Sequence, residues 1–146
     1  MHKTKTMTVC LLIAFFALFA FTVFKIKSIE EFQQKVVLAH ELHKVLEHLT
    51  YDLIEARKNT VLDVPVDGIW HDHIAFIHAR QGAMEYLIKE GGLFRVNNGK
   101  RSLIADDIAD LRIRRQKETP DILEIQVKAQ KNVSLTYNLR IRMFNN

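Results

Sequence analysis

The feature that most constrains this chain is an apolar run over residues 7–24, MTVCLLIAFFALFAFTVF, which contains no charged residue, glycine or proline. At roughly 1.5 Å per residue these eighteen residues form a helix about 27 Å long, enough to cross the core of a bilayer. The run therefore predicts a single transmembrane helix. Residues 1–6 form a short basic tail, and Lys25 and Lys27 follow the run. We expect an inner-membrane (cytoplasmic-membrane) protein with a cytoplasmic N-terminus and an extracytoplasmic C-terminal part.

Two other interpretations of the apolar run fit the residues less well. A cleaved signal peptide has an apolar core of about 7–15 residues followed by small residues at the cleavage site. This run is longer, and no Ala-x-Ala sequence follows it. A lipoprotein anchor would place its cysteine after the run, whereas Cys10 lies near its start. Because Cys10 is the only cysteine, the chain has no intramolecular disulfide and no cysteine-rich zinc site.

The helix is expected to continue beyond the membrane over residues 25–58, where no glycine or proline occurs. Apolar residues recur there at steps of three and four, which is typical of one helical stripe: Ile26, Ile29, Phe32, Val36, Ala39, Leu42, Leu46, Leu49 and Leu53. The simplest interpretation is one helix from Val9 to Arg57, about 73 Å long, whose stripe packs against the head. A membrane-anchored coiled coil has the same spacing and remains an alternative.

Residues 59–146 are expected to form a β-rich head, because the apolar period changes from 3.6 to 2 after VPVDG. Gly91-Gly92 and Asn98-Gly99 separate alternating runs, which indicates hairpins. The expected strands cover 73–79, 83–90, 93–97, 100–105, 111–116, 122–130 and 134–144, with a helical turn or bend at DDIAD, residues 106–110. In the last strand Leu135, Tyr137, Leu139, Ile141 and Met143 should share a buried face. The fold class is therefore α+β, a long N-terminal helix packed on an antiparallel β-meander.

Seven histidines raise the possibility of a metal site. His40, His43 and Glu47 share one face of the expected helix, but HELHK places the second histidine one residue too early for an H-E-x-x-H site. His71, Asp72 and His73, with His78 nearby, could approach each other at a strand end. We favour polar surfaces at both places, hence no metal and no cofactor. Without a nucleophile arrangement, phosphate loop or dinucleotide motif, we also expect no enzymatic activity.

Arg112, Arg114, Arg140 and Arg142 should lie on the outward side of two strands and form a possible basic surface. Basic residues exceed acidic ones by only 21 to 17, a net charge of +4. DNA or anionic lipid is one possible ligand for such a surface. However, Glu124 and Gln126 alternate on the strand between and could pair with the arginines. Because no aromatic residue interleaves with them to stack bases, the partly salt-bridged interpretation is favoured over nucleic acid.

Four segments in order carry a family resemblance: YDLIEAR, HIAFI, EYLIKEGGLFRVNNGKRSLIADDIADLRIRR and the closing LRIRMFNN. Behind a long membrane helix, this series resembles the minor pseudopilins of the type IV pilin class. It is most similar to the J-type subunit of type II secretion and to related minor pilins and competence pseudopilins. The resemblance implies a pilin-like fold, other pilin-like subunits as partners, and a role in protein transport by a bacterial secretion or pilus machine. It also implies packing between membrane helices through Leu11, Phe15, Leu18 and Phe21.

The N-terminal region departs from the pilin pattern. Pilin precursors have a glycine before the cleaved bond and a glutamate five residues into the mature helix, but here no glycine precedes the apolar run and the first acidic residue is Glu30. We therefore expect a pseudopilin-like protein that caps a filament tip or stays in the membrane. Two alternatives stay open: a stand-alone bitopic sensor or adaptor with a small extracytoplasmic binding head, and a DNA-uptake pseudopilin.

Overall fold

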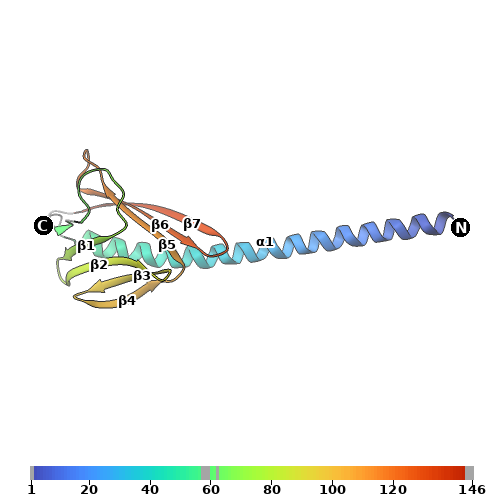
Figure 1. The fold of residues 1–146 in the computed structure, drawn as a ribbon, viewed down its shortest axis with the longest axis horizontal. Helices are drawn as coiled ribbons and strands as arrows, with labels where there is room; N and C mark the ends of the chain where they lie inside the picture. The colour runs from blue at the N-terminus through green and yellow to red at the C-terminus, as the bar shows by residue number, and fades with distance from the viewer. Residues whose placement is uncertain (1, 57–59, 62, 144–146) are drawn as a thin grey trace. The chain divides into compact units, whose positions relative to one another are not determined.

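The computed structural model describes residues 2–56, 60–61 and 63–143, with side chains from Leu12 onward. Helix α1 extends over His2–Ile54 (Figure 1). The chain divides into two compact units, Met1–Gln34 and Lys35–Asn146, and α1 contributes to both. One long N-terminal helix with antiparallel sheets is the α+β class that the sequence predicts.

Four consecutive strands form the first sheet: β1 (Ile74–His78), β2 (Gly82–Lys89), β3 (Gly92–Asn97) and β4 (Lys100–Ala105). All neighbouring pairs are antiparallel. Both predicted hairpins are present, and both central residues of each turn have positive φ. The first turn lies one residue earlier than predicted, because its central residues are Glu90 and Gly91 and the predicted Gly92 already begins β3. Glu90 and Gly91 have φ of 53° and 78°, and Asn98 and Gly99 have 48° and 82°. Positive φ at both positions is the twist-compatible geometry of a two-residue hairpin, which explains glycine or asparagine at three of the four positions; Glu90 is the exception.

The remaining strands form a separate three-stranded sheet: β5 (Ile108–Arg115), β6 (Ile122–Gln130) and β7 (Ser134–Arg142), again antiparallel and in chain order. The single meander of the prediction is thus two sheets. Asp106 and Asp107 form the expected bend between them, with φ of 58° at Asp107. The prediction was wrong in extending this bend to residue 110, because β5 already begins at Ile108.

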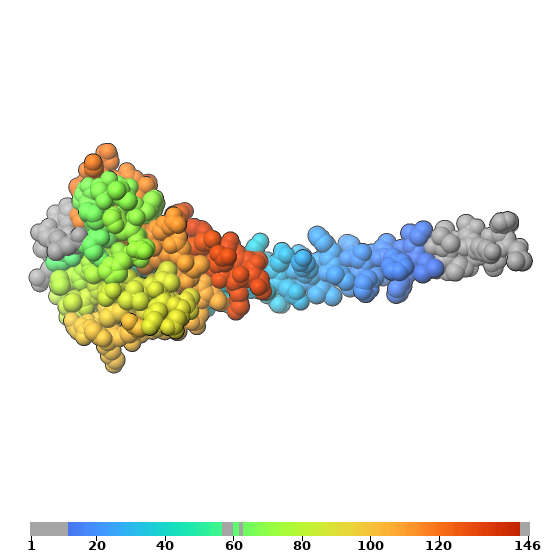
Figure 2. Space-filling view, in the orientation of Figure 1, coloured from blue at the N-terminus to red at the C-terminus, as the bar shows by residue number. Residues whose placement is uncertain are grey.

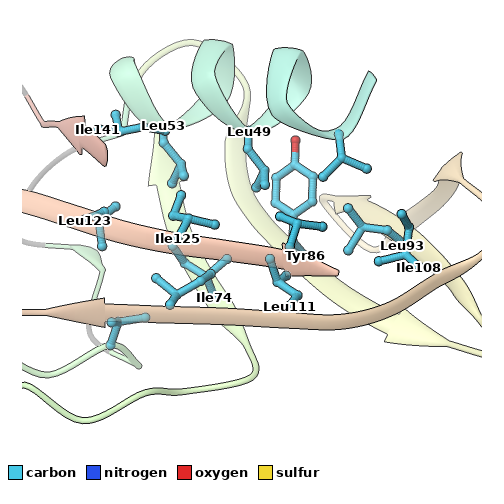
Figure 3. Packing of buried hydrophobic residues seen from close by; sticks show 14 of the residues in the cluster. Leu49, Leu53, Ile74, Tyr86, Leu93, Ile108, Leu111, Leu123, Ile125 and Ile141 are labelled. Atoms are coloured by element: carbon cyan, nitrogen blue, oxygen red, sulfur yellow. The ribbon is translucent and has the colours of Figure 1, made fainter. Parts of the chain in front are cut away.

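The core of the second unit lies between the C-terminal part of α1 and both sheets. Leu49 and Leu53 extend from α1 towards Ile74 and Ile125, which come from the two different sheets (Figure 3). Burial of each such side chain contributes roughly 1.5–3 kcal/mol of hydrophobic free energy. The sheets are therefore held together mainly through apolar contact with the helix and with each other.

The helical stripe that is buried differs from the predicted one. The fully buried apolar positions of α1 are Leu38, Leu42, Val45, Leu49 and Leu53. The prediction was right for Leu42, Leu49 and Leu53 but wrong for Val36, which is exposed, as are Ile26, Ile29 and Phe32. Both stripes have steps of three and four. Leu38 lies two residues from Val36, about 200° around the helix, and periodicity alone does not choose between these faces.

The ends of two elements also differ from the prediction. Helix α1 already includes residues 2–6 of the predicted tail and ends at Ile54, whereas Arg57 lies outside the described residues. Strand β7 ends at Arg142, and Phe144 lies outside the described residues. On β7 the predicted buried face is fully buried only towards its end, at Ile141 and then Met143, while Tyr137 is exposed. An edge strand is covered from one side only, which explains this incomplete burial.

Candidate functional site

The first candidate surface is the apolar part of α1. Phe15, Leu18 and Phe21, predicted to pack between membrane helices, are 61–72% exposed. Figure 2 draws this part of the helix in blue. Leu11, the fourth residue of that prediction, lies outside the described side chains. Exposed large apolar residues also occupy the positions between them, so the segment is apolar on every side: Leu12, Ile13, Phe16, Phe19, Val23 and Phe24. The described part of α1 is long and apolar enough to cross a membrane.

Apolar exposure continues past Lys25, into a stretch that also contains Lys27. Ile26, Ile29 and Phe32 are 53–68% exposed and recur every three residues, so they form one stripe. We call these three residues the juxtamembrane stripe. Glu30 and Glu31 occur within the same stretch, so it does not continue the uncharged membrane run. Exposed large apolar residues in such a charged segment are typical of a surface that another protein covers.

A buried carboxylate, Asp52, connects α1 to the four-stranded sheet. The Tyr86 hydroxyl of β2 donates to Asp52 Oδ2 at 2.6 Å, and the hydroxyl points at the helix in Figure 3. Arg95 of β3 donates from Nε to Oδ2 at 2.6 Å and from Nη2 to Oδ1 at 3.1 Å. Asp52 is 1% exposed, so its charge is compensated entirely by protein groups. We call Asp52, Tyr86 and Arg95 the Asp52 clamp.

The clamp shifts the pKa values of its members. Burial, followed by the hydrogen bond to Asp52, raises the pKa of the Tyr86 hydroxyl, which stays protonated and a donor. Burial alone would lower the pKa of Arg95, but the hydrogen bonds and charge of Asp52 outweigh it and raise this pKa. Both donors therefore stay protonated at neutral pH, which suits a structural clamp.

His78 extends the clamp at the edge of the sheet. Its Nδ1 accepts the backbone N–H groups of Arg80 and Gln81, at 3.1 and 3.2 Å, so Nε2 carries the proton of the neutral ring. That buried Nε2 faces Asp52 Oδ1 at 4.0 Å and Glu55 Oε2 at 3.8 Å, beyond hydrogen-bond distance. The His78 ring thus lies between the end of α1 and β1, and its Nε2 makes no hydrogen bond to either carboxylate.

A second buried cation, Arg115, is bound by backbone carbonyls. It donates to the Pro120 oxygen from Nε at 3.0 Å and from Nη2 at 2.9 Å, and Nη1 lies 3.4 and 3.5 Å from the oxygens of Val61 and Val64. Burial lowers the pKa of Arg115. The side chain joins the segment before β1 to the β5–β6 connection, a positioning role within the fold.

The four arginines of the possible basic surface come together on the outer face of the three-stranded sheet. Arg114 Nε and Arg140 Nη2 both contact Glu124, at 2.6 and 2.7 Å. Hydrogen bonds from Arg114, and then from Gln116, lower the pKa of Glu124. The two remaining arginines have their own carboxylates, with Nε–Oδ2 distances of 2.7 and 3.2 Å respectively: Arg112 with Asp110, and Arg142 with Asp121. This is the partly salt-bridged surface that the sequence favours.

One aromatic residue does join this surface, contrary to the sequence analysis. The Arg114 guanidinium lies 4.3 Å from the centre of the Trp70 ring. The contact arises because His71 pairs with Ile113 of β5 through two backbone hydrogen bonds, which brings the preceding Trp70 alongside the sheet. Sequence spacing gave no sign of this pairing. Since Arg114 occupies the ring and is bound to Glu124, the pair does not offer a vacant stacking platform.

The histidines go to separate places. His40 and His43 are exposed on α1. His71 contacts Asp67 at 3.3 Å, and His73 contacts Asp63 and Glu85, each at 2.7 Å. In the described part of the chain, no three histidine, cysteine or acidic side chains come together as metal ligands.

The Asp52 clamp is the functional feature that the sequence analysis did not single out. Its members lie within the segments that carry the pseudopilin resemblance: Asp52 in YDLIEAR, and Tyr86 and Arg95 in EYLIKEGGLFR. A charged residue within the buried helical stripe was the available signal, because a buried acid requires a cationic partner.

Comparison with known proteins gives no match among family models, curated proteins or solved structures. Function must therefore be inferred from the residues themselves.

Proposed function

We propose that this chain is a membrane-anchored structural component, similar to a minor pseudopilin, of a type II secretion or type IV pilus-related machine. It acts by assembling with other pilin-like subunits and carries out no catalysis. Residues 7–24 lie in the inner membrane, the N-terminus is cytoplasmic and the β-rich head is extracytoplasmic.

The observation that carries this proposal is the juxtamembrane stripe. A simple anchor requires apolar exposure only where lipid covers it, which the uncharged run 7–24 already provides. Ile26, Ile29 and Phe32 follow Lys25 in a charged stretch, yet they remain exposed. Covering them with a neighbouring helix removes apolar surface from water at roughly 25 cal/mol per Å². Packing between N-terminal helices is the contact on which pilin-like subunits rely, so the stripe favours assembly over a solitary anchor.

Site-specific photocrosslinking tests this proposal. A photoreactive phenylalanine derivative is introduced at Phe32, and a matched control variant carries it at Glu30, about 200° around the helix. In intact membranes of the native host, the tagged chain with the probe at Phe32 should form adducts with pilin-like proteins, and the control should form fewer. Adducts to lipid alone, or equal adducts at both positions, would contradict assembly and favour the bitopic adaptor.

Membrane retention is tested separately. Replacing Leu18 and Phe21 together by lysine puts two charges into the apolar run, and each costs about 2.5–3.5 kcal/mol at the centre of a membrane helix. The double variant should leave the membrane fraction, whereas a variant with lysine at the exposed positions His40 and His43 should remain there. Normal retention of the double variant would disprove the anchor.

A further inference from the structure

The outer faces of the two sheets differ in chemistry. The three-stranded sheet presents arginines, Glu124 and Gln126, as expected of a sheet with one face in water. The four-stranded sheet instead presents mostly apolar residues on the face opposite the core. Alternation along the paired strands places the following residues there: Ala75, Ile77, Ala83, Glu85, Leu87, Lys89, Phe94, Val96, Arg101 and Leu103. Ile77 and Leu103 are exposed, and most of the others are half-buried.

A pocket of about 410 Å³ occupies one end of this apolar face. Its floor is hollow because two alanines lie opposite larger neighbours: Ala75 is paired with Glu85, and Ala83 with Ile77. Val96 of β3 forms the far wall. Thr60 and Asp63 form the near wall, and the Thr60 hydroxyl is fixed there by accepting the Ile77 N–H at 3.0 Å. A hollow of this composition suits an aliphatic side chain.

The rim of the pocket is acidic. Glu85 and Asp63 each place one carboxylate oxygen 2.7 Å from a ring nitrogen of His73. Two carboxylates against one histidine ring make acidic groups the majority at the rim. The other Asp63 oxygen, Oδ1, is buried without a hydrogen-bond partner. Of the two strand cations on this outer face, Arg101 lies over the Phe94 ring at 5.6 Å and Lys89 Nζ lies 3.6 Å from Glu90 Oε1. The charge at the rim is therefore complementary to a cation.

We propose that this pocket binds an extended segment of a partner protein that carries an aliphatic side chain next to a lysine or arginine. The aliphatic side chain enters the hollow over Ala75 and Ala83, and the cation lies against Glu85. The site is on the head and is separate from the helical surface that supports the proposed function, so neither inference depends on the other.

Methyl NMR of the full chain in detergent micelles tests this binding. The probe is the acetylated, amidated peptide Val-Leu-Lys-Val, compared with the same peptide carrying glutamate instead of lysine. The lysine peptide should shift the methyl signals of Ala75, Ile77 and Ala83, and it should bind several-fold more tightly than the glutamate peptide. No shift of these methyls, or equal affinity for both peptides, would overturn the proposal.

Two variants with matched controls distinguish the contribution of the hollow to peptide binding from that of the rim. Ala83→Leu fills the hollow and should lower the affinity for the lysine peptide by roughly tenfold or more, because loss of apolar pocket contacts has effects of this size. Ala109→Leu, at an exposed alanine of β5, should have no effect. Glu85→Gln should lower the affinity for the lysine peptide about threefold and should not lower the affinity for the glutamate peptide. The exposed Glu118→Gln should leave both affinities unchanged. Unchanged binding by both pocket variants would refute the site, and the remaining methyl signals report whether each variant is folded.

Discussion

The Asp52 clamp provides the sharpest test of how the helix is fixed to the head. Replacing Asp52 by asparagine keeps the shape of the side chain but removes its charge and one acceptor oxygen. Oδ1 and Oδ2 now accept three hydrogen bonds from Tyr86 and Arg95. An asparagine that keeps its oxygen towards Tyr86 must present its amide group, a donor, to the guanidinium, which cannot accept.

The expected loss follows from the burial of the partners. Breaking a fully buried ion pair from one side costs about 3–5 kcal/mol, because the other charge is left uncompensated. In the variant the charge of Arg95 stays partly compensated, since its side chain is 18% exposed and Nη2 also donates to Gln81 Oε1 at 2.8 Å. We therefore expect Asp52→Asn to lower the free energy of unfolding by about 3 kcal/mol. Tyr86→Phe, which removes one hydrogen bond to a charged acceptor, should lower it by about 1.5 kcal/mol.

Urea unfolding of the full chain in detergent micelles, followed by the fluorescence of Trp70, measures these losses. Asp72→Asn is the matched control, because Asp72 is exposed and outside the clamp. The double variant of Asp52 and Tyr86 should lose less than the sum of the single variants, since both changes break the same bond. Surface substitutions usually change the free energy of unfolding by no more than about 0.5 kcal/mol. If Asp52→Asn stays within that margin of the control, the role given to the clamp is refuted.

Three further outcomes are expected. Because the pKa of Glu124 is lowered by Arg114, its contribution to stability is complete above the usual carboxyl pKa and is lost as the pH falls through the lowered one. Glu124→Gln should flatten the pH dependence of the urea midpoint from roughly pH 5 to pH 3, and an unchanged profile would contradict this. Gly82→Ala should lower the free energy of unfolding by about 1–2 kcal/mol, since φ is +82° and the new Cβ would lie 2.9 Å from Asn98 Oδ1. A decrease below about 0.5 kcal/mol would be inconsistent with that strain. Arg115→Lys should cost about 2 kcal/mol in the same assay, because an ammonium group does not reproduce the forked contact with one carbonyl, and wild-type stability would disprove it.

Local features of the fold could be predicted because each depends on a few neighbouring residues. Asn98-Gly99 predicts its hairpin directly, since positive φ is accessible to both residue types. Gly91-Gly92 predicts the other hairpin, but the turn itself lies one residue earlier, at Glu90 and Gly91. The helix of residues 25–54 follows in the same way from the absence of glycine and proline. The end of the four-stranded sheet was harder to predict. Asp106-Asp107 resembles any polar bend, and only the pairing of β5 with β6 shows that a new sheet begins there.

Features that depend on distant residues could not be predicted from the sequence alone. Which face of α1 is buried depends on the apolar residues of the sheets that contact it. Apolar residues at steps of three and four also occur on the face that stays exposed. The Asp52 clamp joins residues up to 43 positions apart. The Trp70–Arg114 contact requires the backbone pairing of His71 with Ile113, a register with no local sequence signal.

The last strand of each sheet bears on how the head resists polymerisation. Within the described residues, β1 and β4 are the edge strands of one sheet and β5 and β7 those of the other. β1 and β5 each form one further bridge, to Ala56 and His71 respectively, whereas the outer edges of β4 and β7 have none in that part of the chain. Both edges carry adjacent or alternating cations, Lys100 and Arg101 on β4 and Arg140 and Arg142 on β7. Two copies approaching through β4 would bring like charges together, which discourages cross-β growth, whereas Arg140 and Arg142 on β7 are already paired with Glu124 and Asp121. A protein concentrated in the plane of a membrane meets its own copies far more often than one in dilute solution. Charges on a terminal strand such as β4 therefore discourage pairing between heads that lie close together.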